Sequence, residues 1–95
     1  MISYNAQEIL KKMVAADADE DYEDAELVCE GRECWLGHWR IRRAAVNELL
    51  LNCLISDRGE EKGIERFAIN EDGRKAAIDR SYVNQALAAR RAVKQ

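Results

Sequence analysis

The cysteines and the single histidine are the residues of this chain best suited to bind a metal. Cys29, Cys34, His38 and Cys53 supply four potential zinc ligands, in the order C-x4-C-x3-H-x14-C. Structural zinc sites use closely spaced ligand pairs, and this spacing matches none of their common forms. Cys53 also lies among apolar residues at a helical spacing, where a small hydrophobic residue is expected. We therefore expect buried thiols, with no metal and no cofactor.

A run of acidic residues is the second feature with chemical potential. The segment DADEDYEDAE holds seven acids in ten residues, namely Asp17, Asp19, Glu20, Asp21, Glu23, Asp24 and Glu26. The first three aspartates have the spacing that opens an EF-hand calcium loop, but Tyr22 stands where that loop requires glycine. One interpretation is a solvated loop or a short exposed helix. The other is phosphate mimicry, in which the first six acids bind a partner protein in place of nucleic acid.

A set of residues able to catalyse a reaction does not emerge from the sequence. There is one histidine, and no glycine-rich phosphate loop or nucleophile with a recognisable partner is present. The sequence predicts that the protein is not an enzyme.

Length and composition predict one soluble domain. The chain has 95 residues, of which 47% are hydrophobic and 35% are charged. No apolar run approaches the roughly 18 residues that a membrane span needs. The first residues lack the pattern of an export signal, and three cysteines do not pair evenly. We expect a reduced, cytoplasmic protein that does not enter a membrane.

Charge is distributed unevenly along the chain. Residues 1–30 hold nine acidic and two basic residues, a formal charge of −7, whereas residues 31–95 hold thirteen basic and nine acidic residues, a formal charge of +4. This asymmetry favours nucleic acid or a charged protein as the partner.

The elements that must position these residues follow from apolar spacing. Residues 3–16 and 42–54 have apolar residues at i, i+3, i+4, i+7 and i+8, which predicts two amphipathic helices. Residues 27–36 predict a short hairpin turning at Glu-Gly-Arg, with a short helix as the alternative. A strand then follows residue 54, a polar turn occupies DRGEEKG, and a second strand contains Phe67 and Ile69. A final helix is expected over residues 71–95.

The corner between the last strand and the last helix has local structural reasons. Asn70 is a favourable N-cap residue, and Glu71 and Asp72 suit the positive end of a helix dipole. Gly73 would let the first helical turn pack closely against the hairpin.

The order of these elements resembles a winged helix-turn-helix domain. RIRRAAVNELLLNCLIS resembles the recognition helix and the next strand, and GIERFAINEDGRKAAI resembles the second wing strand and corner of MarR-type and PadR-type regulators. The resemblance implies a mainly α protein with a small β-hairpin and a long C-terminal helix. It implies one domain over 1–95, with an acidic helix and loop in 1–30, a recognition helix and wing in 38–70, and a C-terminal helix in 71–95.

Candidate DNA contacts follow from this resemblance. Arg43 and Asn47 share an exposed stripe of the recognition helix, and both residue types can contact base edges. Wing cations would contact phosphates. The full candidate set is Arg40, Arg42, Arg43, Asn47, Arg58, Lys62 and Arg66. The alternative interpretation is a solvated charged face, interleaved with five acids.

Two further surfaces are candidates for protein contact. Leu51 falls on the exposed stripe and, with the tryptophans Trp35 and Trp39, favours a protein partner. The expected C-terminal helix presents an apolar stripe that predicts a homodimer, through Ile78, Tyr82, Val83 and Leu87.

Three functions therefore remain open. The first is a small DNA-binding transcriptional regulator. The second is an acidic interaction protein of phage type that inhibits a host nucleic-acid-binding complex by DNA mimicry, as some anti-CRISPR proteins do. The third is a winged helix that serves as an assembly module.

Overall fold

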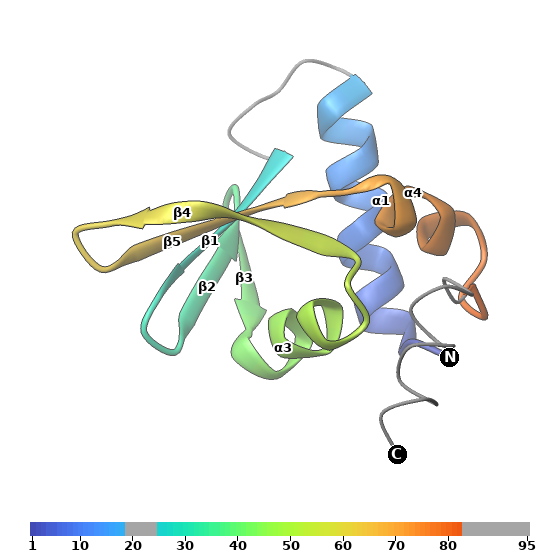
Figure 1. The fold of residues 1–95 in the computed structure, drawn as a ribbon, viewed down its shortest axis with the longest axis horizontal. Coiled ribbons are helices and arrows are strands. Elements are labelled where there is room, and N and C mark those ends of the chain that lie inside the picture. Colours follow the sequence, from blue (N-terminus) through green and yellow to red (C-terminus); the bar gives the residue numbers. More distant parts are fainter. Residues whose placement is uncertain (19–24, 83–95) are drawn as a thin grey trace, which may run out of the picture.

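A computed structural model of the chain describes residues 1–18 and 25–82. Over these residues the order is α1 (Tyr4–Ala18), β1 (Glu26–Glu30), β2 (Glu33–Leu36), β3 (Trp39–Arg42), α3 (Arg43–Leu51), β4 (Ile55–Glu61), β5 (Ile64–Ile69) and α4 (Glu71–Ile78). The strands form one five-stranded sheet in the order β3-β2-β1-β5-β4, with every neighbouring pair antiparallel. Figure 1 shows the labelled helices gathered at one side and the tip of the β4–β5 hairpin pointing away from them.

The expected fold class is wrong. A mainly α architecture with one small hairpin was predicted, but the described residues form a five-stranded antiparallel sheet with three helices. The hairpin expected over 27–36 is present as β1 and β2, and β1 pairs with β5 as well. The β4–β5 hairpin, expected as a separate wing, is therefore part of the sheet. Residues 40–42, which the resemblance placed at the start of the recognition helix, belong to β3 (Trp39–Arg42) instead.

Three tight turns make this sheet possible. Gly31 and Gly37 have φ of 62° and 61° at the first turn position of the β1–β2 and β2–β3 hairpins. A glycine with positive φ at that position fits a two-residue turn whose twist matches the flanking strands. Lys62 and Gly63 both have positive φ, at 55° and 81°, as the mirror-image turn of the β4–β5 hairpin requires. The polar turn expected over DRGEEKG is thus wrong, because β4 continues to Glu61.

One face of the sheet, the inner face, supplies the core. Leu27, Cys29, Leu36, Ile41 and Phe67 are buried on four different strands. The expected stripe of the first helix packs against them, since Ala6, Ile9, Leu10 and Met13 are fully buried in α1. Strand side chains alternate between the two faces, so each buried residue is followed by one that points away from the helices.

The N-terminus of α1 is connected to the second half of α3. Ser3 caps α1, because its Oγ accepts a hydrogen bond from the Ala6 amide at 3.1 Å. The Ser3 amide and hydroxyl in turn donate to the Glu48 carboxylate of α3, at 2.8 and 2.7 Å. α3 ends at Leu51, earlier than the expected 54, and Cys53 follows with a φ of 57°. Leu54 is nevertheless buried, as its place on the apolar stripe indicates.

The strand-to-helix corner forms as the sequence indicates. The Asn70 side chain accepts a hydrogen bond from the Gly73 amide at 2.8 Å and caps α4. A Cβ atom on Gly73 would lie 2.2 Å from the Leu54 carbonyl oxygen, so the close packing of this turn requires glycine.

The long C-terminal helix is the second error of the fold prediction. α4 ends at Ile78, and Asp79 has an extended backbone. The Asp79 carboxylate accepts hydrogen bonds from the Ser81 amide and hydroxyl at 3.0 and 2.7 Å. Such a local turn competes with continued helix, and the periodic apolar pattern gave no sign of it. Residues 83–95 of the expected helix lie outside the described part of the chain.

The expectation of reduced thiols is corrected at one pair. Cys29 and Cys34 are buried as predicted, but they are opposite each other on β1 and β2, with Cα atoms 4.1 Å apart, and form a disulfide. Cys53 is a free, half-buried cysteine. Because the strand register was not apparent in the sequence, neither was this pairing.

Candidate functional site

The outer face of the sheet is the most distinctive surface of the described residues. Its centre is apolar and consists of Val28, Trp35, Ile64 and Ala68, which are half-buried. The charged residues of β1, β2, β3 and β5 on this face, which we call the rim, are Glu26, Glu30, Glu33, Arg40, Arg42 and Arg66. Five of them lie around the apolar residues, and Arg66 lies on β5 between Ile64 and Ala68. We call these ten residues the outer face.

Strand register brings these residues together. Val28 lies on the central strand, with Trp35 beside it on β2 and Arg66 beside it on β5. Ile64 and Ala68 are two residues from Arg66 on either side, so they are the diagonal neighbours of Val28 on the same face. Arg40 extends the row beyond Trp35 on β3.

The apolar centre is not part of the hydrophobic core. Trp39 and Ile69 are partly buried and pack against the core, whereas the four central outer-face residues do not. Trp39 points to the inner side, where Lys12 of α1 lies 4.8 Å from the centre of its ring. The two tryptophans thus have different environments, and only Trp35 contributes to the outer face.

The rim carries both signs of charge. Arg40 donates to the Glu33 carboxylate at 2.6 Å, in a pair whose two side chains are 69% and 57% exposed. Arg42 and Arg66 make no ion pair with any other described residue. An exposed pair such as Arg40–Glu33 exchanges its partner at little cost, so three guanidinium groups of this rim can bind an external group.

The structure separates the candidate DNA contacts of the sequence. Arg40, Arg42 and Arg66 lie on the outer face, whereas Arg43 lies at the start of α3 and forms a 3.2 Å ion pair with Glu65. Arg43 is 28% exposed in this pair, so it connects α3 to β5. Asn47 is exposed on α3, Arg58 pairs with Glu26 at 3.9 Å, and Lys62 lies at the hairpin turn.

The helix expected to read DNA bases exposes few groups suited to that role. The exposed residues of α3 are Ala44, Asn47 and Leu51, without a cation among them. Leu51 is 70% exposed and lies on α3, apart from Trp35 on the sheet. The surface expected to join Leu51 and the tryptophans is therefore distributed over three elements, α3, β2 and β3, and the two tryptophans lie on opposite faces of the sheet.

The predicted acidic site is described at one residue. Asp17 lies in the last turn of α1 and forms an ion pair with Arg74 of α4. Asp19, Glu20, Asp21, Glu23 and Asp24 lie outside the described residues.

The predicted dimer surface is described at two residues. Ile78 is 88% exposed at the end of α4. Tyr82 is half-buried, and its hydroxyl donates to the Asp72 carboxylate at 2.6 Å, which raises the pKa of Tyr82 because that bond needs the protonated phenol. Val83 and Leu87 lie outside the described residues.

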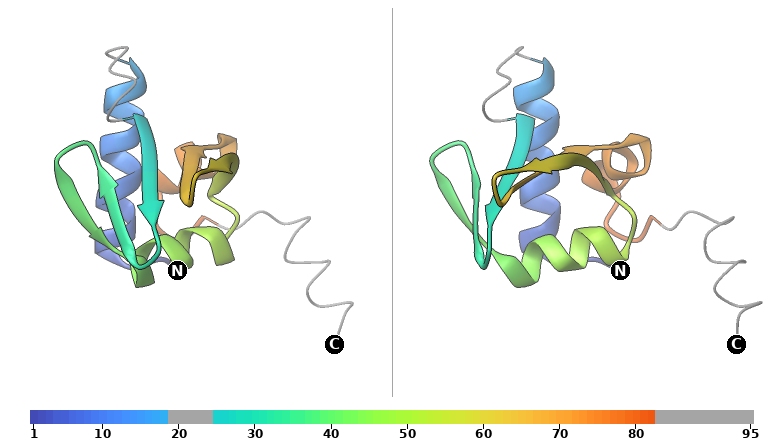
Figure 2. Two further views of the ribbon diagram at one scale, coloured as in Figure 1. Left: turned by 90° about the vertical axis from the view of Figure 1, so that its left-hand side faces the viewer. Right: turned by 60° about the vertical axis from the view of Figure 1, so that its left-hand side comes forward.

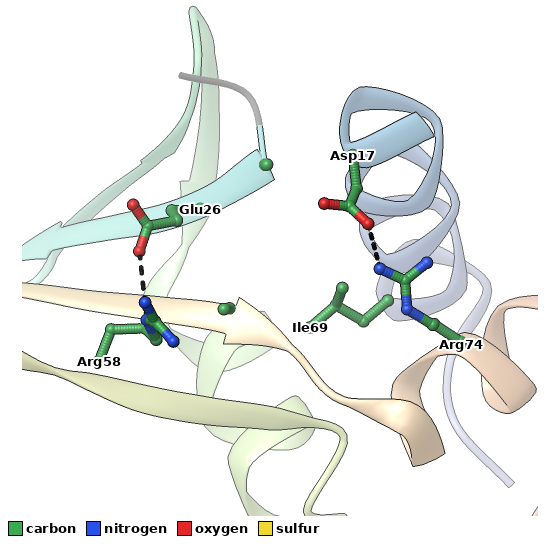
Figure 3. Close-up of a pocket in the computed structure, with 7 residues that line it drawn as sticks. Asp17, Glu26, Arg58, Ile69 and Arg74 are labelled. Carbon is green, nitrogen blue, oxygen red and sulfur yellow. Dashed lines mark hydrogen bonds and ion pairs between the residues drawn. The ribbon is translucent and has the colours of Figure 1, made fainter. Parts of the chain in front are cut away.

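A small pocket where the start of β1 and the end of β5 meet α1 and α4 is the alternative site, and it shares Glu26 and Ala68 with the outer face. It has a volume of about 210 Å³ and is lined by Asp17, Ala25, Glu26, Arg58, Ala68, Ile69 and Arg74. Figure 3 shows the guanidinium group of Arg74 directed at Asp17 and that of Arg58 directed at Glu26. Each cation is therefore neutralised by a carboxylate within the pocket, which leaves little charge to hold a ligand.

Metal ligands are not clustered in the part of the chain that the structure describes: no group of three or more His, Cys, Asp or Glu residues could hold an ion there. None of the described helices has the length and apolar character needed to cross a membrane.

The described residues thus define a small α+β protein with one face of its sheet uncovered by its helices. Comparison with protein-family models, characterised proteins and solved structures gave no match to this chain.

Sequence reasoning missed the outer face as a unit. It identified Trp35, Arg40 and Arg66 separately, but not Val28, Ile64 or Ala68. The alternation of buried and exposed residues in ELVCE and ECWL was a usable signal, because Val28 and Trp35 are apolar at positions that point opposite to Cys29 and Cys34. An apolar residue on both faces of a strand indicates a sheet that is covered on both sides.

Proposed function

We propose that this chain is a small protein-binding module and that the outer face of its sheet is the binding surface. The observation that carries the proposal is the composition of that face. Val28, Trp35, Ile64 and Ala68 form an apolar group outside the core, with Arg66 between two of them on β5 and the other charged residues around it. A desolvated apolar centre with a polar rim is the usual anatomy of a protein interface, and tryptophan and arginine are enriched at its energetic centre.

The charge of the rim favours a protein over a nucleic acid. Glu26, Glu30 and Glu33 lie between the arginines, and carboxylates at these positions repel phosphate groups. The formal charge of the whole chain is −3, which adds to that repulsion. A protein surface that is apolar at its centre and carries both signs of charge around it would match the outer face in both apolar contact and charge.

Nucleic acid is the competing partner, because Trp35 lies between Val28 and Arg40 on a sheet, where a base could stack on its ring. The two partners can be separated with one fluorophore. The chain has two tryptophans, so Trp39→Phe leaves Trp35 as the only one. Single-stranded DNA and RNA oligonucleotides should leave the emission of Trp35 unchanged at low salt. Salt-sensitive quenching by either would overturn the proposal in favour of nucleic acid.

The partner itself can be identified by a photo-reactive amino acid placed at Trp35. The cross-linked protein is then purified and its affinity measured for the wild type, for Trp35→Ala and for Val28→Glu. We expect both variants to weaken binding by roughly a hundredfold, the usual size of a hot-spot effect. Ile78→Ser is the matched control, because Ile78 is an exposed apolar residue on α4, away from the sheet. Equal weakening by all three variants would count against the outer face.

A further inference from the structure

The two edges of the sheet differ in how open they are to another strand. β4 forms one edge and contains a bulge between Asp57 and Gly59, where the pairing with β5 shifts register. Its exposed residues include Asp57, Glu60 and Glu61. Bulges and charged side chains are the devices by which natural sheets close an edge to further pairing.

β3 forms the other edge and has no bulge, although two of its four residues are exposed arginines. Its four residues pair with β2 in continuous register, and none of the other described strands pairs with its outer side. Figure 2 places the β2–β3 hairpin at one margin of the molecule, apart from the β4–β5 hairpin. The chain contains no proline, so no residue of this edge lacks a backbone donor.

Hairpin geometry indicates which backbone groups are available. Leu36 and Trp39 flank a two-residue turn and so form a hydrogen-bonded pair, after which bonded and non-bonded pairs alternate. Trp39 and Ile41 therefore direct their amide and carbonyl groups to β2. Arg40 and Arg42 direct their amide groups outward, along the open edge.

Side-chain charge at this edge selects what can pair there. Arg40 and Arg42 are exposed on the outer face, while Ile41 is buried on the inner face. A second copy of the chain is disfavoured. The two antiparallel registers that would pair three residues of β3 with themselves are centred on Arg40 or on Ile41. The first places Arg40 opposite Arg40, and the second places it opposite Arg42, and like charges at directly opposed positions destabilise a sheet.

We infer that the open edge of β3 binds an extended acidic segment of the partner protein by strand addition. Backbone hydrogen bonds to the outward groups of Arg40 and Arg42 supply the pairing. Carboxylates of the added strand lie opposite the two arginines on the outer face, and its alternate apolar side chains lie beside Ile41 and Trp39. The inference rests on the proposed function, since Arg40 and Arg42 belong to both the outer face and this edge.

Synthetic peptides test the edge without the partner. The probe is a blocked octapeptide of alternating glutamate and valine, and the control replaces each glutamate by lysine. Binding is followed by two-dimensional NMR of the isotope-labelled protein. We expect the glutamate peptide to shift the amide resonances of Arg40 and Arg42 in a saturable manner and to slow their exchange with solvent. The residues of β4 should not respond, and the lysine peptide should not bind.

Charge reversal provides the matched variant. The double variant Arg40→Glu, Arg42→Glu should lower the affinity for the glutamate peptide by roughly tenfold or more, because attraction becomes repulsion. The same variant should bind the lysine peptide. The same spectra report whether the variant remains folded. Equal binding of both peptides, or glutamate-peptide binding with unchanged resonances at Arg40 and Arg42, would overturn the inference.

The purified complex separates failure of the inference from failure of the proposed function. Loss of partner binding in Trp35→Ala together with unchanged Arg40 and Arg42 amides in the complex would overturn strand addition and leave the outer face as the binding surface. Undiminished binding in Trp35→Ala and Val28→Glu would overturn the proposed function itself.

Discussion

The two faces of the sheet are made by alternate residues of the same strands, yet they have different roles. In β1, Leu27 and Cys29 point to the helices and are fully buried, whereas Val28 between them points outward and is half-buried. All three residues are apolar, so residue type alone does not separate core from surface here. The difference is that helices cover the inner face, whereas the described helices leave the outer face to water or to a partner.

The largest expected effect on stability is the difference between truncating two adjacent residues of β1. Leu27→Ala should lower the free energy of unfolding by about 2–5 kcal/mol, because it leaves a cavity in a packed core. Val28→Ala should cost at most about 1 kcal/mol, the range of strand propensity at a partly exposed position. Urea unfolding of both variants measures this. Similar losses for the two would mean that the outer face is also packed in the isolated protein.

Reduction of the disulfide is the next largest effect. Cys29 and Cys34 close a loop within the β1–β2 hairpin, with a sequence separation of 5. A loop this short restricts the unfolded chain by about 2 kcal/mol in the loop-entropy treatment. Urea unfolding with and without a reductant measures the loss, and Cys53→Ser should leave it unchanged. If the protein unfolded without reductant has three reactive thiols, Cys29 and Cys34 are not paired.

A smaller effect distinguishes two arginines that the sequence placed in one group. Arg43 pairs with Glu65 on the inner side, and both side chains are about two-thirds buried, at 28% and 33% exposure. Arg43→Ala should therefore cost about 1 kcal/mol of stability, the upper range for such pairs. Arg66→Ala should stay within about 0.5 kcal/mol, as for an ordinary surface position. The opposite ranking in thermal unfolding would reverse their assigned roles.

The smallest expected effect concerns the pKa of Asp79, whose carboxylate lies on neither face of the sheet. Hydrogen bonds from the Ser81 hydroxyl and amide hold the pKa of Asp79 below its usual value of 3.8. A depressed carboxyl pKa contributes stability that is present above 3.8 and is lost as the pH falls through the folded value. Ser81→Ala should move the NMR titration midpoint of Asp79 upward. An unchanged midpoint would show that the hydroxyl bond does not form in solution.

Local signals in the sequence were read correctly where neighbouring residues decide the structure. The apolar stripe of residues 3–16 gave α1 and its buried side chains, and Asn70 with Gly73 gave the corner before α4. The hairpin over residues 27–36 was also identified, because its turn and its strands are continuous in sequence. Each of these elements depends on contacts within a few residues or on one repeated period.

The tertiary structure alone decided what depends on strand pairing between distant segments. Pairing of β1 with β5 turned an expected wing into part of the sheet and brought Val28 beside Arg66. The short β3 converted an expected helical region into an open edge. The sequence of a strand indicates which of its residues share a face of the sheet, but it does not indicate which strand lies beside it. The composition of the outer face and of its free edge follows from that choice of neighbours, because the ten outer-face residues come from four strands.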